Sequence, residues 1–199
     1  MADHSGTTSS SPPTTSPTRY DVDVVVVGAG FAGMYMLQRL RSLGYSARAF
    51  EAGTGVGGTW YWNRYPGARC DVESLEYSYS FDEELQQEWE WTERYSSQPE
   101  ILAYANHVAD RFSLRESIQF ETRVEAAKFD EDDNVWSVRT SDGQTTVCRF
   151  FVMATGCLSS TSLPTFDGIE EFGGTTVHTG QWPKEGVVLK GKRVGVVGT

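Results

Sequence analysis

The chain has few cysteines and histidines, and none of them stands in a pattern that binds a metal. Its three cysteines, Cys70, Cys148 and Cys157, are an odd number without a C-x-x-C pair. This count indicates reduced thiols in a cytoplasm rather than a disulfide framework or a zinc site. His107 stands in no ligand pattern with metal spacing, so we interpret it as a surface or hydrogen-bonded histidine. The sequence therefore predicts no metal centre.

The chain also lacks an excess of basic residues and any long apolar run. Its 17 Lys and Arg residues are outnumbered by 27 Asp and Glu residues, which gives a formal charge of −10. Nucleic acids and anionic membranes are not expected partners, because binding to them relies on a basic surface. No stretch approaches the roughly 18 apolar residues of a transmembrane helix, and the N-terminus lacks the basic-then-apolar order of a signal peptide. We expect a soluble, acidic, cytoplasmic protein.

Residues 1–20 are almost without apolar side chains and are dominated by Ser, Thr and Pro. A segment of this composition buries too little apolar area to offset the entropy of ordering. We therefore predict a disordered tail at 1–20. The rest of the 199 residues is long enough for one sizeable core, or for one domain and the start of another.

The strongest feature present is a β-branched run that breaks into three spaced glycines. Four successive valines at 24–27 predict a strand buried on both faces of a parallel sheet. The G-x-G-x-x-G spacing that follows suits a tight turn, a close approach of backbone N–H groups to a pyrophosphate, and tight packing of a helix whose positive N-terminus attracts phosphate. The alternative is a glycine-rich structural turn. The predicted binding residues here are Gly28, Gly30, Phe31, Ala32 and Gly33.

The residues after this loop favour a dinucleotide site. A helix is predicted from about Phe31 to Leu43, ending at Gly44, and a second strand at 46–51. Glu51 lies 51 − 28 = 23 positions after the first glycine. An acid at this point accepts hydrogen bonds from a free ribose and repels a 2′-phosphate, so the site is predicted to hold FAD or NAD rather than NADP.

A long loop at 53–71 combines glycines with aromatic and basic residues. A loop of this length inside a compact domain is usually functional. Its aromatic rings offer flat apolar surface to a planar group, and Arg64 and Arg69 suit phosphate or carboxylate. The alternative is an aromatic mini-core under the loop.

The remaining stretches predict a helix and a small antiparallel sheet. Residues 75–95 suggest a short strand and then an irregular or helical piece. Ser97 to Glu100 resembles a capping box that opens an amphipathic helix of about 14 residues. At 154–156, Ala-Thr-Gly suits either a cofactor contact or a simple turn. Further strands are predicted at 118–124, 128–129, 135–140 and 145–153, the last returning to the parallel sheet.

Two segments resemble the Baeyer–Villiger monooxygenases, the FAD enzymes that insert oxygen beside a ketone. The first runs from Gly57-Gly58-x-Trp60 through Tyr65-Pro66-Gly67 to Asp71. Its residue sequence is especially similar to that of the phenylacetone monooxygenase branch. The second matches F-x-G-x-x-x-H-T-x-x-W-P at every fixed position, whereas N-oxygenating relatives usually carry Phe or Tyr in place of the final Trp-Pro. Its glycines, imidazole and rigid proline predict a hinge; the alternative is a structural interdomain linker whose histidine holds backbone carbonyls. The fixed residues are Phe172, Gly174, His178, Thr179, Trp182 and Pro183.

The resemblance, which covers 21–199, implies an α/β fold. It consists of a Rossmann-like FAD-binding domain of the two-dinucleotide-binding type with a small antiparallel β insert. The given sequence is expected to be cut at the first strand of a second Rossmann domain. The implied parts are the N-terminal portion of the FAD-binding domain at 21–157, an interdomain linker at 158–190 and the truncated start of an NADP-binding domain at 191–199. There, Lys192 to Val197 predicts a strand that reaches a second phosphate loop at Gly198 and Thr199. The chain is thus interpreted as an N-terminal fragment.

The resemblance also implies an activity and a set of site residues. NADPH would reduce FAD, and O₂ would then give a C4a-peroxyflavin that converts a small-molecule ketone to an ester or lactone. Asp71 would orient a catalytic arginine that lies beyond Thr199, so the fragment alone is expected to be inactive. The alternatives are an N- or S-oxygenating flavin monooxygenase and a non-catalytic FAD-binding fragment. Residues implied to line FAD are Gly58, Thr59, Trp60, Tyr61, Trp62, Asp71, Tyr77 and Val124, with Arg69 and Cys70 approaching the nicotinamide cofactor.

Overall fold

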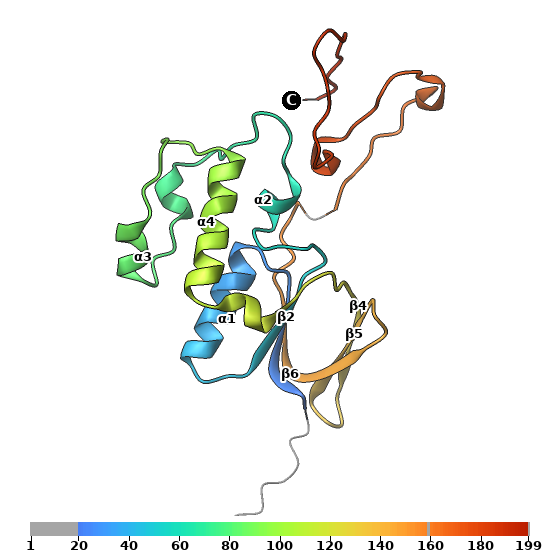
Figure 1. Cartoon of the computed structure of the whole chain (residues 1–199). Coiled ribbons are helices and arrows are strands. Elements are labelled where there is room, and N and C mark those ends of the chain that lie inside the picture. The colour runs from blue at the N-terminus through green and yellow to red at the C-terminus, as the bar shows by residue number, and fades with distance from the viewer. Residues whose placement is uncertain (1–19, 159, 199) are drawn as a thin grey trace, which may run out of the picture.

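A six-stranded mixed sheet forms the centre of the fold, and the longer helices lie to one side of it (Figure 1). The structure, a computed structural model, describes residues 20–158 and 160–198. Residues 1–19 of the tail predicted at 1–20, and the predicted binding residue Thr199, therefore lie outside the described residues. In chain order the elements are β1 Val22–Val27, α1 Phe31–Ser42, β2 Ala47–Phe50, α2 Thr59–Trp62, a 3-10 helix Ser74–Tyr77, α3 Glu83–Glu88, α4 Gln98–Arg111, a 3-10 helix Leu114–Ser117, β3 Ile118–Gln119, β4 Val124–Asp130, β5 Val135–Thr140, β6 Thr145–Met153, and 3-10 helices Ile169–Glu171 and Thr179–Gln181.

The strand order is β3-β2-β1-β6-β5-β4. β1 runs parallel to both β2 and β6, and β2 runs parallel to β3, whereas β4, β5 and β6 form an antiparallel meander. The predicted insert is therefore continuous with the parallel sheet through β6. This arrangement places the carboxyl ends of β1 and β2, and the loops that follow them, at the same edge of the sheet.

The core lies between the sheet and the helices α1 and α4. Val24, Val25 and Val26 of β1 are almost fully buried, as the run of valines predicts for a central strand. One face of β1 packs in a cluster with α1 and α4 that includes the fully buried Tyr104, and the other face packs against the meander. The first glycine loop is thus attached to the most deeply buried strand of the fold.

Three local predictions are wrong. Residues 74–77 form a 3-10 helix, not a strand. The predicted strand at 118–124 stops at Gln119, because Glu121 takes a left-handed backbone with φ 53° that cannot continue a pleated strand. The capping box is absent as well: Ser97 makes no side-chain cap hydrogen bond, and the Glu100 carboxylate instead accepts from the Thr92 N–H at 2.7 Å.

The strand predicted from Lys192 to Val197 does not form either. Residues 192–198 belong to no strand, and Val194, Val196 and Val197 are 56%, 83% and 81% exposed. A parallel strand is stable only when neighbouring strands pair with it and both of its faces are covered. Among the described residues, strands β1 to β6 pair with one another and not with this segment.

In the parts of the chain at 20–158 and 160–198, no helix is both long and apolar enough to cross a bilayer.

His107 has its Nε2 atom 3.8 Å from a Glu88 carboxylate oxygen and its ring against Trp89. That nitrogen has no hydrogen-bond partner among the described residues. His107 is thus a packed, half-exposed residue between α3 and α4.

Candidate dinucleotide-binding site

The three glycines after β1 each relieve a backbone contact. Gly28 has φ +99°, and a Cβ atom there would lie 2.7 Å from the Ala154 carbonyl oxygen. A Cβ on Gly33 would lie 2.0 Å from the Gly28 carbonyl oxygen, which is far inside van der Waals contact. The first glycine therefore makes the turn and the third lets α1 pack on the strand, as the motif predicts.

Gly30 has a role that the motif alone does not indicate. A Cβ on Gly30 would lie 3.3 Å from the Cα of Gly58, and a Cβ on Gly58 would lie 2.8 Å from the Cα of Gly30. The Gly57 N–H also donates to the Ala29 carbonyl at 3.0 Å. The loop after β1 and the loop at 53–58 therefore meet backbone to backbone.

The N-terminus of α1 leaves amide donors without acceptors in the helix. Gly30 is the N-cap and brings no side chain, and the first turn holds no acidic residue. The Met34 N–H is the first to bond back, to the Gly30 carbonyl at 2.9 Å. The N–H groups of Phe31, Ala32 and Gly33 thus have no intrahelical partner, and together with the helix dipole they suit a negatively charged group.

Glu51 joins the two glycine loops. Its side chain is buried at 5% exposure. One carboxylate oxygen accepts from the Ala29 N–H at 2.8 Å, and the other accepts from the Gly53 N–H at 2.7 Å. Each oxygen keeps a further lone pair, so the carboxylate can still accept from a ribose hydroxyl. Sequence reasoning missed the bridge, because it depends on how the two loops fold toward each other.

Tyr61 lies directly under the second glycine loop. A Cβ on Gly53 would lie 2.7 Å from Tyr61 Cε1, and one on Gly55 would lie 3.1 Å from Tyr61 Cε2. Thr59 opens the short helix α2 that carries this ring. Trp62, the neighbour of Tyr61 at 4.9 Å between ring centroids, is 39% exposed. Tyr61 is thus part of the loop's support, while Trp62 is open to solvent.

Trp60, Cys70 and Tyr77 form one small cluster with Ile101 of α4. The Tyr77 ring meets Trp60 and Phe31 edge to face, each at 5.5 Å between centroids. Burial raises the pKa of the Tyr77 hydroxyl, and the nearby Cys70 and Asp71 add to this rise. The aromatic mini-core considered for this loop therefore exists, and Phe31 and Tyr77 also line a pocket of about 310 Å³ beside it.

Arg69 and Asp71 flank the buried Cys70 and differ in their partners. The Arg69 guanidinium donates to the Glu93 carboxylate at 2.6 Å, and this hydrogen bond raises the pKa of Arg69. Asp71 is exposed, and no hydrogen bond or ion pair joins its carboxylate to another residue that the structure describes. Asp71 is thus available to a cation that these residues do not supply.

Val124 stands apart from the rest of the predicted site. It opens β4 and packs against the core cluster of the meander, which includes Phe50 and Val138. None of the described residues in that cluster belongs to the glycine loops at 28–33 and 53–58. Its place beside a cofactor stays a prediction.

The segment with the fixed residues from Phe172 to Pro183 extends away from the sheet (Figure 1). The His178 Nδ1 atom accepts from the Gly180 N–H at 3.0 Å, so the histidine holds a backbone N–H and not the carbonyls expected for a linker histidine. Phe172 is 61% exposed. Just past this segment, the Lys184 ammonium lies 3.3 Å from the Tyr61 hydroxyl. Nothing in the sequence pattern indicated that contact.

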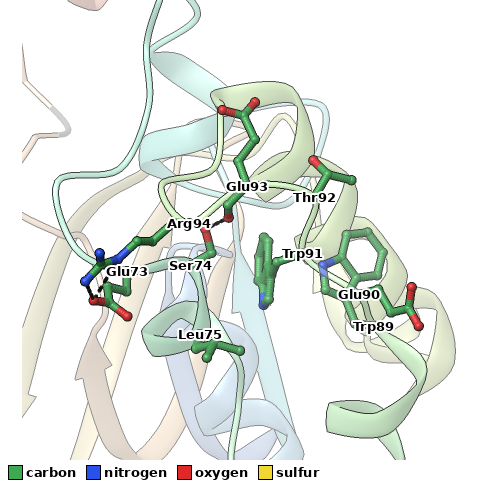
Figure 2. A pocket seen from close by; sticks show the side chains of 9 residues that line it. All are labelled: Glu73, Ser74, Leu75, Trp89, Glu90, Trp91, Thr92, Glu93 and Arg94. Carbon is green, nitrogen blue, oxygen red and sulfur yellow. Dashed lines mark hydrogen bonds and ion pairs between the residues drawn. The ribbon is translucent and has the colours of Figure 1, made fainter.

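A larger pocket lies outside the predicted site. It has a volume of about 500 Å³, and Figure 2 shows that its lining includes Trp89 and Trp91 as well as the ion pair of Glu73 and Arg94. None of the predicted binding residues lines it. The dinucleotide prediction therefore rests on the two glycine loops and not on this pocket.

Comparison with known proteins reveals relatives along almost the whole chain. A phenazine N-monooxygenase of Lysobacter antibioticus is 50% identical over 178 residues, which cover 89% of this chain and 33% of the relative. A Baeyer–Villiger monooxygenase of Pseudooceanicola batsensis is 49% identical over 180 residues, which cover 90% of this chain and 33% of the relative. The chain thus spans about a third of the length of these curated relatives.

The solved structure of an oxidized steroid monooxygenase bound to NADP has the same fold. It superposes with a TM-score of 0.85 at 61% identity, over 89% of this chain and 34% of that chain. The likeness confirms the predicted α/β fold class. The family model described as FMO-like, flavin-binding monooxygenase-like, matches residues 21–199. The chain belongs to the flavin-binding monooxygenase-like family.

Proposed function

We propose that this chain forms the FAD-binding part of a Baeyer–Villiger monooxygenase, which uses NADPH and O₂ to insert one oxygen atom next to a ketone carbonyl and gives an ester or lactone. The observation that carries the proposal is the meeting of the two glycine loops at Gly30 and Gly58 beside the free N–H groups at the start of α1, in a member of a flavin-binding family. These parts together suit a phosphate group, and we call them the phosphate cradle. A flavin held by a dinucleotide loop is FAD. Free thiols at Cys70, Cys148 and Cys157 support a cytoplasmic location.

The residues present fit FAD at the phosphate and ribose. The donors of α1 suit the pyrophosphate, and the glycines leave room for its close approach. The Glu51 carboxylate has lone pairs left for ribose hydroxyls, and its negative charge would repel a 2′-phosphate. NADPH would need a second cradle, for which Gly198 and Thr199 would form the start, in an NADP-binding domain that opens at 191 after a linker at 158–190.

FAD supplies the redox and oxygen-transfer chemistry when bound. The chain's own side chains position it and exclude water. Trp60 and Tyr77 offer aromatic surface beside α1, and Arg69 and Cys70 lie on the side proposed for the nicotinamide. The Asp71 carboxylate is unpaired among the described residues, so we propose that it orients an arginine from outside this chain, which stabilises negative charge during oxygen transfer.

The test starts with the protein purified from its source cells. We expect an intact mass well above 22.1 kDa, flavin absorbance, and ester or lactone formation when NADPH and a panel of ketones are supplied. A species of 22.1 kDa with flavin but without activity would favour the non-catalytic FAD-binding fragment. A preparation without flavin would contradict the proposal as a whole.

A second candidate, N-oxygenation, is favoured by one observation. The relative that is 50% identical is a phenazine N-monooxygenase, so identity in this part of the chain does not separate the two reactions. Trp182 and Pro183 favour the Baeyer–Villiger reaction, by resemblance. Offering a phenazine and a ketone to the same enzyme preparation, and identifying N-oxide or ester by mass spectrometry, decides between them.

A further inference from the structure

The hydroxyl of Tyr61 is the point where three separate segments meet. It accepts from the Thr54 N–H at 3.1 Å and lies 2.7 Å from the Thr54 Oγ1 atom. The third neighbour is the Lys184 ammonium at 3.3 Å. A phenol has one proton to donate and two lone pairs to accept with, so donation to Thr54 Oγ1 and acceptance from the two nitrogens use its full capacity.

Lys184 is held at this place by the ring as well as by the hydroxyl. Its ammonium lies 5.5 Å from the Tyr61 ring centroid, within reach of a cation–π attraction. The ring is buried at 9% exposure and does not move freely, because it lies under Gly53 and Gly55. Burial raises the pKa of the Tyr61 hydroxyl, but its hydrogen bonds with Thr54 and Lys184 and the positive charge of Lys184 outweigh burial and leave the pKa below its ordinary value.

The contact connects distant parts of the chain. Lys184 follows directly on the segment from Phe172 to Pro183, and Tyr61 supports the loop at 53–58 that touches Gly30 of the phosphate cradle. We propose that Lys184 is a positioning residue that fastens this segment to the second glycine loop through the Tyr61 hydroxyl. The proposal rests on the proposed function only where it concerns FAD: loss of the contact loosens the loop and speeds FAD release.

The first test needs no cofactor. In the Tyr61→Phe variant, Lys184 loses its hydroxyl partner, so trypsin should cleave after Lys184 about twofold to tenfold faster, the range expected for one lost hydrogen bond. Cleavage after Lys190 in the same digest is the internal control and should keep its rate. The Tyr65→Phe variant, a phenol on the same loop without a described hydrogen bond, should leave both rates unchanged. Equal cleavage after Lys184 in Tyr61→Phe and in the unaltered protein would overturn the proposal.

The second test measures FAD release from the holoprotein by the rise in flavin fluorescence. Lys184→Met and Tyr61→Phe should each raise the dissociation rate about twofold to tenfold, the double variant should add little to either, and Lys184→Arg should restore slow release. Additive effects, or no rescue by arginine, would overturn the coupling. A protein that binds no FAD but shows the trypsin result would refute the proposed function and leave the Lys184 contact standing.

Discussion

The Glu51→Gln substitution tests whether this carboxylate ties the two glycine loops together. Glu51 accepts two backbone N–H groups with two oxygens, whereas glutamine has one oxygen and one NH₂ group. One of the two N–H donors would therefore face another donor in a site that is 5% exposed. Losing a hydrogen bond to a charged group and leaving a buried donor unpaired costs about 2–4 kcal/mol.

Urea unfolding of the cofactor-free protein measures this cost. We expect a lower midpoint at an unchanged slope, because the compactness of the two states does not change. A loss of about 2–4 kcal/mol corresponds to a fall in Tm of roughly 4–16 °C for a chain of this size. Glu121→Gln, an exposed acid in the loop before β4, is the matched control and should change stability by less than about 0.5 kcal/mol. A Glu51→Gln variant as stable as that control would refute the reasoning.

Three further predictions concern packing, the exposed acid and pH. Gly33→Ala places a Cβ 2.0 Å from a backbone oxygen, and we expect it to lower the free energy of unfolding by at least about 3 kcal/mol. Gly173 has open space around it, so Gly173→Ala should leave stability unchanged. Thermal unfolding of the two variants measures the difference. Asp71→Asn should leave the urea midpoint unchanged and strongly lower ketone oxidation by the whole protein, and unchanged turnover would contradict its proposed role. Hydrogen bonds from the Ser46 side chain and backbone lower the pKa of Asp23 below 3.8, so this stabilisation is present above that pH and is lost as the pH falls through the folded pKa. Midpoints measured in an acid series should fall less steeply in Ser46→Ala.

Patterns within one element predicted the fold well. The strand signals at 135–140 and 145–153 predicted the bounds of β5 and β6 as the structure has them, and apolar spacing predicted the 14 residues of α4. Both signals depend only on which side of an element is buried. The capping box failed for a different reason, since the Glu100 carboxylate found a tertiary partner in the Thr92 N–H.

The site was predicted less completely than the fold. Glycine spacing predicted the tight turn at Gly28 and the close packing of α1 at Gly33, because a motif records backbone needs that are local in sequence. The hydrogen bond from Ala29 to Glu51 joins residues 22 positions apart, and the contact between Tyr61 and Lys184 joins residues 123 positions apart. No periodicity records such pairs, because they arise only when loops fold against each other.

The meeting of Gly30 with Gly58 has a consequence for how the sequence can vary. In most packed pairs, a larger side chain on one side can be accommodated by a smaller one on the other. Here both residues are already glycine, and the atoms in contact are backbone atoms. Neither residue has a side chain that could be shortened, so no substitution at one position can make room for a larger side chain at the other. A side chain at Gly58, which also has φ +55°, would therefore force the two backbones apart, and one at Gly30 would require a shift of a few tenths of an ångström.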